Sequence, residues 1–214
     1  PSVLSFSGAV GSTTSIINML VGFFSGVSVG AGVIISQRFG AKDPEGVHKA
    51  VHTTISLTLI IGLIGTVVGI FLAPVMLTLM KTPHDVFIEA KAYLQIYFSG
   101  ISGLMLYNMG SGILRAVGDS RRPLYFLVFS SCVNIVLDLV FVLVFHMGVE
   151  GVAYATIIAQ FSSAALIYVT LYRTQDVHRF QPSKLRIYPE MMKSIVRVGL
   201  PSGLQQALTS FSNV

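Results

Sequence analysis

Hydrophobic residues along this chain fall in long blocks rather than in an alternating or short amphipathic pattern. A helix of about 20 apolar residues crosses the ~30 Å hydrocarbon layer of a bilayer, and most of the blocks are at least that long. The pattern therefore predicts an all-α fold, a polytopic bundle of transmembrane helices. The predicted spans are residues 8–37, 52–80, 92–114, 123–145 and 150–172, and a further block, 198–214, runs into the end of the chain.

Composition agrees with this class of protein. Hydrophobic residues make up 53% of the 214 and charged residues only 11%, which is too little charge to cover a soluble globule of this size. The single cysteine, Cys132, excludes an intramolecular disulfide. Because the chain has no tryptophan, tyrosines near the span ends, such as Tyr93 and Tyr125, are expected to anchor the helices at the membrane interface.

The loops between the predicted spans differ in charge. Loops 38–51, 115–122 and 173–197 together carry twelve lysines and arginines, whereas the two other loops carry two. Alternate loops lie on the same side of a membrane, so the positive-inside rule places these three in the cytoplasm of a multi-pass protein of the cell membrane, plasma or inner. The net charge of +5 follows from this topology, and no nucleic-acid partner is predicted. Span 8–37 then enters from outside, which predicts one further helix upstream.

Asp138 is the only acidic residue inside any of the long apolar stretches. A carboxylate near the middle of a bilayer costs roughly 2.5–3.5 kcal/mol on insertion scales and persists mainly where it faces a cavity or a partner. Asn134 lies four residues earlier, so both oxygen-bearing side chains share one face of the helix. The pair predicts half of a cation or proton site within the membrane. The alternative is a packing hydrogen bond made by a protonated Asp138.

A third ligand is predicted on the next span. The connection His146–Glu150 is short, so its two helices should lie side by side and antiparallel. A hairpin centred near residue 147 places Asp138 level with Thr156, roughly 10–12 Å from the external ends of the two spans. Asn134, Asp138 and Thr156 would then form a pocket of hard oxygen ligands, which suits Na⁺ or a proton better than a soft metal. The alternative for Thr156 is a hydrogen bond to its own backbone four residues back.

Other features carry less functional information. His48 and His52 have the spacing of a metal pair, but no carboxylate or cysteine completes a set, and a place near anionic headgroups explains them better. Pro74 can kink its helix and leave a backbone carbonyl free. Gln160 either hydrogen-bonds a neighbouring helix or lines a substrate path. The sequence has no Walker loop, no Ser/His/Asp set and no nucleotide-binding glycine motif, so neither ATP-driven transport nor enzymatic activity is predicted.

Three segments resemble the multidrug and toxic compound extrusion (MATE) family of secondary transporters. Residues 8–43, GAVGSTTSIINMLVGFFSGVSVGAGVIISQRFGAKD, resemble the family's second helix and the cytoplasmic loop after it. Residues 114–123, LRAVGDSRRP, resemble the loop between the fourth and fifth helices. Residues 198–213, VGLPSGLQQALTSFSN, resemble the opening of the seventh helix. The resemblance covers essentially the whole chain.

This resemblance implies two six-helix lobes that open alternately to either side of the membrane around a central cavity. Residues 1–172 would be an N-terminal lobe without its first helix, 173–197 the cytoplasmic loop between lobes, and 198–214 the start of the C-terminal lobe. In many prokaryotic members an Asp on the first helix, an Asn and an Asp on the fifth and a Thr on the sixth form a cation site. Asn134, Asp138 and Thr156 match the last three, and the first-helix Asp has no counterpart in this sequence.

The expected function is cation-coupled antiport, with Na⁺ or H⁺ as the coupling ion and no other cofactor, that exports organic cations, drugs or other amphipathic small molecules. Its partners would be the bilayer and the remainder of the transporter, namely the first helix and the C-terminal lobe. One alternative is a flippase for lipid-linked oligosaccharides of the same superfamily, although such proteins usually line the cavity with cationic residues and these spans contain none. Another is a membrane-embedded binding or assembly protein without a transport cycle, which has little use for a carboxylate at depth.

Overall fold

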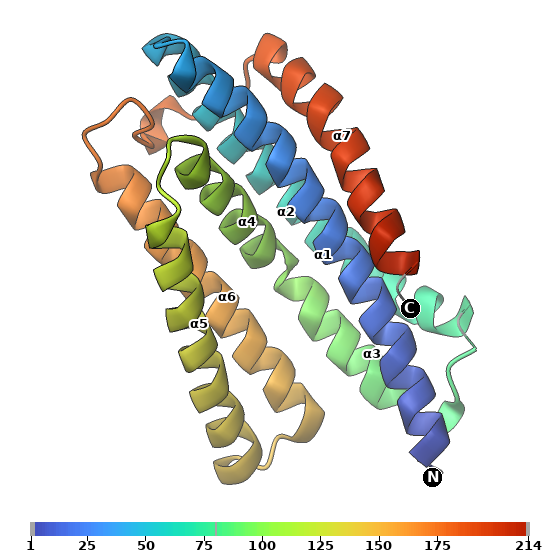
Figure 1. Cartoon of the computed structure of the whole chain (residues 1–214). Helices are drawn as coiled ribbons and strands as arrows, with labels where there is room; N and C mark the ends of the chain where they lie inside the picture. Colours follow the sequence, from blue (N-terminus) through green and yellow to red (C-terminus); the bar gives the residue numbers. More distant parts are fainter. Residues whose placement is uncertain (1–2, 80, 213–214) are drawn as a thin grey trace.

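The structure, a computed structural model, describes the backbone of residues 3–79 and 81–212 and the side chains of residues 21–79, 81–84 and 87–209. Residues 1, 2, 80, 213 and 214 lie outside the described part, including the ends of two predicted spans. The described part is helical and contains no strand, as the sequence predicts. Its long helices run side by side as a bundle (Figure 1). They are α1 (Val3–Gly40), α2 (Pro44–Leu79), α3 (His84–Ser99), α4 (Ile101–Ala116), α5 (Arg121–Leu139), α6 (Gly148–Arg173) and α7 (Pro189–Ser212).

Within the described part, three helical stretches are long and apolar enough to cross a membrane: α2, α6, and α5 together with the π-helical turn that continues it, Val140–Val144. The outer helix of the bundle is α5, on which only Pro123 and Ser130 are buried. Most of its exposed side chains are large and apolar, for example Leu127 and Val136. A face of this kind is stable next to lipid and would be costly next to water.

The predicted span 92–114 is divided in the structure. Segments α3 and α4 meet at Gly100, where the regular helix is interrupted. Helix α6 comes close at this point, because a Cβ added to Gly100 would meet the side chain of Ile157. The interruption thus coincides with a close helix contact that only glycine allows, and hydrophobicity along the sequence does not reveal such a contact.

Helix α7 begins earlier than the sequence predicts. Its first residue is Pro189, inside the segment 173–197 that was expected to be a loop. The first two turns are amphipathic: Met191 and Ile195 are buried, whereas Lys193 is exposed. Hydrophobicity averaged along the sequence does not reveal such turns, because the exposed charged residues lower the average that the buried apolar residues raise. The connection between α6 and α7 is therefore residues 174–188, which contain one 3₁₀ turn, Pro182–Lys184.

Helices α1 and α7 lie against each other along much of their length (Figure 1). Gly26 and Gly30 of α1 face Gly203 and Gly199 of α7 so closely that a Cβ at Gly30 would overlap the backbone of Gly199. These glycines recur every four residues on one face of α1, and α7 is the helix packed against that face. Small residues allow helices to approach closely in a membrane, where the hydrophobic effect does not drive helices together.

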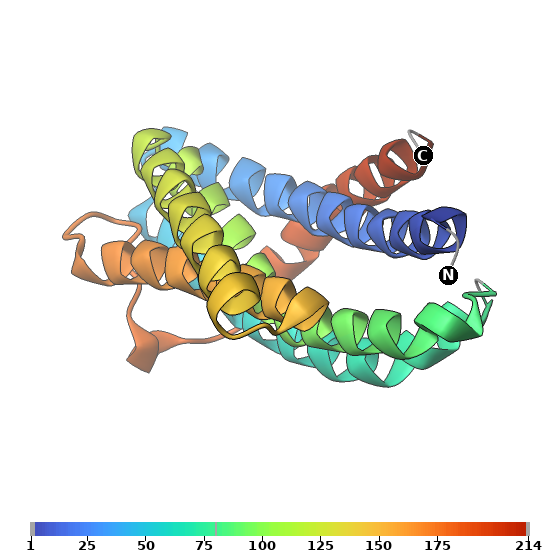
Figure 2. The ribbon, with the colours of Figure 1, turned by 90° about the horizontal axis from the view of Figure 1, so that it is seen from below.

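The three charge-rich connections lie at one end of the bundle. These are the α1–α2 turn, the α4–α5 loop and the α6–α7 connection, which gather at the top of Figure 1. Figure 2 shows the other end, with the α5–α6 turn and the N-terminal end of α1. This arrangement agrees with the prediction that alternate loops share one side of the membrane.

Candidate cation site

Helices α5 and α6 form an antiparallel hairpin that carries the three predicted ligands. The turn between them is tight, with His146 at a φ of 53° and Gly148 at 60°. Two contacts fix the alignment of the helices. The buried Ser130 hydroxyl donates a hydrogen bond of 2.8 Å to the carbonyl of Ala159, and Phe141 packs against Gly151.

Asn134 and Asp138 lie one turn apart on α5 and are both half-buried. The Asn134 Nδ2 and Asp138 Oδ1 atoms are shielded from solvent, and neither has a hydrogen-bond partner among the described residues. The ion pairs of the described part also leave Asp138 without a cationic side chain. A buried polar atom without a partner is costly, so such atoms in a native protein usually mark a place where water, an ion or a proton binds.

Along the α5–α6 hairpin, Thr156 lies level with Asn134 rather than with Asp138. Interpolation between the Ser130–Ala159 and Phe141–Gly151 contacts places Thr156 about level with Asn134, and Asp138 about one turn nearer the hairpin turn. The expected level match of Thr156 with Asp138 is therefore shifted by about a turn. The shift has two causes. The centre of the hairpin lies about one residue before the predicted centre at residue 147, and α5 ends in a π-helical turn, which contains one residue more than an α-helical turn.

The hydroxyl of Thr156 donates a hydrogen bond of 3.0 Å to the carbonyl of Val152, as the alternative reading of this residue expected. This bond uses the hydroxyl hydrogen and leaves the lone pairs of the oxygen available to a cation. The two interpretations of Thr156 are thus compatible in this structure.

Helix α3 carries two tyrosines, Tyr93 and Tyr97, inside the bundle. Tyr93 is half-buried, although its position in the sequence suggested an interfacial anchor. Tyr97 is buried, stacks on Tyr93 with 6.4 Å between ring centroids, and lies near Gln160 of α6. The spacing of Tyr93 and Tyr97, one helical turn apart, is the signal that could have grouped them. Polar side chains of α3 and α6 therefore meet inside the bundle, where these two helices pack together.

Of the two histidines of α2, His52 contacts the α6–α7 connection. The Nε2 atom of His52 accepts a hydrogen bond of 3.1 Å from the backbone N–H of Gln181, and its Nδ1 lies 2.9 Å from the carbonyl of His48. These contacts dock the α6–α7 connection on α2, together with a bond from the Tyr188 N–H to the Thr53 hydroxyl. The described residues contain no cluster of three or more potential metal ligands among histidine, cysteine, aspartate and glutamate.

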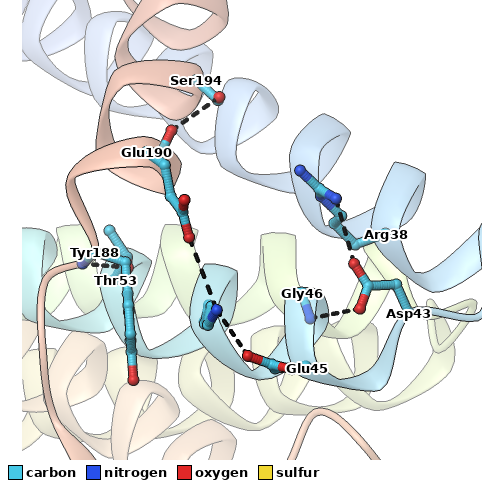
Figure 3. A network of polar contacts seen from close by, with 9 residues as sticks. Arg38, Asp43, Glu45, Gly46, Thr53, Tyr188, Glu190 and Ser194 are labelled. Atoms are coloured by element: carbon cyan, nitrogen blue, oxygen red, sulfur yellow. Dashed lines mark hydrogen bonds and ion pairs between the residues drawn. The ribbon is translucent and has the colours of Figure 1, made fainter.

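The charged end of the bundle also joins α7 to the α1–α2 turn (Figure 3). Lys49 lies 2.7 Å from Glu45 and 3.8 Å from Glu190 of α7. Arg38 and Asp43 form a second ion pair of 3.2 Å across the turn. These residues line a cleft of about 310 Å³, in which charges of opposite sign are already paired. We therefore assign the cleft to the junction between helices and not to ligand binding.

Comparisons with known proteins agree with this architecture. The MatE family model matches residues 7–140, and the chain therefore belongs to the MatE family. It is similar to the probable multidrug resistance protein YpnP of Bacillus subtilis (strain 168), with 34% identity over 200 residues that cover 92% of this chain and 44% of the relative. It is also similar to the probable multidrug resistance protein NorM of Thermotoga maritima, with 28% identity over 86% of this chain and 40% of the relative.

Solved structures show the same arrangement of helices. A crystal structure of MATE in the bent conformation matches with a TM-score of 0.89 and 30% identity, over 99% of this chain and 47% of that one. The outward-facing conformation of a multidrug resistance MATE family transporter matches with a TM-score of 0.88, over 98% and 47%. The resemblance seen in the sequence is thus confirmed, and the protein is a multi-pass membrane protein. The chain spans about half the length of the relatives it matches.

Proposed function

We propose that the protein is a cation-coupled antiporter that exports organic cations or other amphipathic small molecules by alternating access. The observation that carries this proposal is the pair of shielded, unpartnered polar atoms on Asn134 and Asp138 in an otherwise apolar helix. The printed names of the relatives, which are multidrug resistance proteins and MATE transporters, support the transport class. They give no support to an enzymatic activity.

Coupling follows from the charge of Asp138. A carboxylate within the bilayer is costly when it is bare and much less so when a cation or proton neutralises it. Asn134 and Thr156 can supply further oxygen ligands to Na⁺, whereas H⁺ would be held by the Asp138 carboxyl alone. If the occupied and empty forms favour different conformations of the lobe, cation binding shifts their populations and substrate release follows.

The proposed orientation places the charged end of the bundle in the cytoplasm of a cell membrane. The gathering of the connections 41–43, 117–120 and 174–188 at one end supports it, since these carry or flank most of the lysines and arginines. The site around Asp138 then lies in the half of the bundle nearer the outside, from which the driving ion enters.

The test is transport by the full-length protein in proteoliposomes, followed as accumulation of a fluorescent cationic dye under an imposed Na⁺ or pH gradient. Asp138→Asn keeps the shape of the side chain and removes its charge, so gradient-driven accumulation should fall at least about tenfold. Ser131→Ala is the matched control on α5: its hydroxyl is exposed and bonds only the backbone of Leu127. This control should transport like the wild type.

Two results would contradict the proposal. Intact gradient-driven export in Asp138→Asn would remove Asp138 from the coupling site. Absence of dye movement under either gradient, in protein shown to be folded, would favour the flippase or the non-transporting binding protein.

A further inference from the structure

Few side chains of helix α5 are buried in the bundle, and one of them is polar. Pro123 and Ser130 are the two buried residues of this helix. The Ser130 hydroxyl donates a hydrogen bond of 2.8 Å to the carbonyl of Ala159 on α6. The other serine of α5, Ser131, bonds the carbonyl of Leu127 in its own helix, as serines inside helices commonly do. Ser130 is thus a directional link between α5 and α6.

This link lies next to the candidate cation site. Asn134 is one turn further along α5, about 6 Å from Ser130 along the helix axis, and Thr156 is about 4.5 Å from Ala159 along the axis of α6. Asp138 follows one turn after Asn134 on the same face of α5. The bond therefore joins the two helices at the end of the site that lies farther from the hairpin turn.

The predicted ligands are fixed relative to their own helices. Asn134 and Asp138 belong to one uninterrupted stretch of α5 and keep their separation when α6 moves. The Thr156 hydroxyl donates a hydrogen bond of 3.0 Å to the carbonyl of Val152, which fixes its oxygen on α6. The alignment of α5 with α6 is therefore the variable that decides how far the Thr156 oxygen lies from a cation held by the α5 ligands.

Two contacts hold this alignment, one on each side of the site. Near the hairpin turn, Phe141 packs against Gly151, so that a Cβ added to this glycine would lie 3.0 Å from the Phe141 Cβ. On the other side, the contact is the bond between Ser130 and the Ala159 carbonyl. A hydrogen bond has a preferred direction, whereas the apolar contacts that would remain without the hydroxyl do not. Removal of this donor should therefore loosen the alignment where Asn134 and Thr156 lie.

We propose that Ser130 is a positioning residue: its hydrogen bond to the Ala159 carbonyl aligns α5 with α6 and so brings the Thr156 oxygen to a cation bound at Asn134 and Asp138. The inference rests on the proposed role of Asp138 as the cation-binding group. Ser130 itself does not bind the cation, and its effect reaches the site through Thr156.

The experiment measures dye export by the full-length protein in proteoliposomes as the Na⁺ concentration is raised. Na⁺ is the probe because Thr156 can add an oxygen ligand to a metal cation, whereas a proton is held by the Asp138 carboxyl alone. Ser130→Ala removes the donor and should raise the half-saturating Na⁺ concentration by about three- to tenfold, with the maximal rate per folded protein within about twofold of the wild type. Ser130→Thr keeps the hydroxyl and should stay within about twofold of the wild type in both quantities.

The matched control is another buried serine of the same hairpin. The Ser163 hydroxyl donates a hydrogen bond of 2.9 Å to the carbonyl of Gln160 within α6 and does not link two helices. Ser163→Ala therefore removes a buried hydroxyl without removing a link to α5, and its half-saturating Na⁺ concentration should equal that of the wild type.

A further variant shows whether the effect passes through the threonine. Thr156→Val keeps the shape of the side chain and removes its oxygen. In this background Ser130→Ala should change the half-saturating Na⁺ concentration by less than about twofold, because the ligand that Ser130 aligns is gone. A role of Ser130 in stability alone would lower the midpoint of thermal unfolding in both backgrounds and leave the Na⁺ dependence unchanged.

Three results would overturn the inference: an unchanged half-saturating Na⁺ concentration in Ser130→Ala, a shift that persists in the Thr156→Val background, or a wild type without Na⁺-dependent export. If Ser130→Ala does not fold, Ser130→Cys takes its place, because a thiol is a weak donor, and a shift of less than about twofold is then the refutation. Asp138→Asn in the same assay separates the two levels. Cation-dependent export that survives in Asp138→Asn contradicts the proposed function, whereas its loss there with normal Na⁺ dependence in Ser130→Ala contradicts only the role of Ser130.

Discussion

Replacing Gly30 with alanine should destabilise the protein through the contact between α1 and α7. The added Cβ would overlap the backbone of Gly199. A flexible side chain could swing aside, but here the obstacle is backbone, so one helix must shift relative to the other. The substitution therefore tests whether α7 is held against α1 by close packing of glycines.

The expected magnitude combines two opposing effects. Overpacking of a tight contact typically costs about 1–3 kcal/mol. Alanine is the better helix former by up to about 1 kcal/mol, which offsets part of that cost. The net loss of stability is then about 0–2 kcal/mol, equivalent to a midpoint of thermal unfolding lower by up to about 8 °C for a chain of this size, and the midpoint should lie below that of a glycine-to-alanine change without the overlap.

The assay is thermal unfolding of the purified protein in detergent, with Gly32→Ala as the matched control. Gly32 lies on the same helix, and a Cβ there would sit 3.6 Å from the carbonyl of Gly112, an ordinary contact. The midpoint of Gly32→Ala should equal or exceed that of the wild type because only the helix-propensity gain applies. If Gly30→Ala proved as stable as Gly32→Ala, the close packing of α1 and α7 would be refuted.

Three further predictions concern the connections around this core. Lys49→Met removes the partially exposed ion pairs with Glu45 and Glu190, and because such pairs contribute about 0–1 kcal/mol each, the unfolding midpoint should fall by less than about 8 °C; a larger loss would contradict this. Burial lowers the pKa of His178 below its ordinary value of 6.5, so docking of the α6–α7 connection is fully stable above that pH and weakens as the pH falls. Amide hydrogen exchange of residues 175–181, corrected for intrinsic rates, should accelerate below about pH 6.5 in the wild type and not in His178→Phe, and equal behaviour of the two would refute this. Gly100→Ala should lower stability by about 1–3 kcal/mol, and Ile157→Ala should restore part of it, whereas additive losses in the double variant would show that the two residues are not in contact.

The sequence predicts the class of the fold well because a membrane imposes strong constraints. Long apolar blocks predict helices, and one carboxylate in such a block, Asp138, is conspicuous because its burial is costly. Asn134 follows from helical spacing alone. These inferences require only the period of the α-helix and the free-energy cost of placing a charged side chain in lipid.

The features that the sequence does not predict depend on contacts between helices. Tyr93 resembles an interfacial anchor in the sequence, whereas the packing of α3 half-buries it in the bundle. The level of Thr156 depends on a π-helical turn that no residue pattern indicates. Pro74 predicts a free carbonyl, but only the structure identifies Gln95 as its donor. In each case the outcome is decided by how one helix is rotated or aligned against another, and hydrophobic periodicity does not contain that information.

The proposed function requires that cation binding at the site around Asp138 be coupled to substrate binding. The most direct measurement is release of bound cation when a transported dye is added to the full-length protein in detergent, recorded as a change in pH or in free Na⁺. Reciprocal linkage requires that, if cation binding weakens substrate binding, substrate binding weakens cation binding by the same factor. We expect release of Na⁺ or H⁺ by the wild type and none by Asp138→Asn that still binds the dye. Equal release from both proteins would show that the coupling ion binds elsewhere.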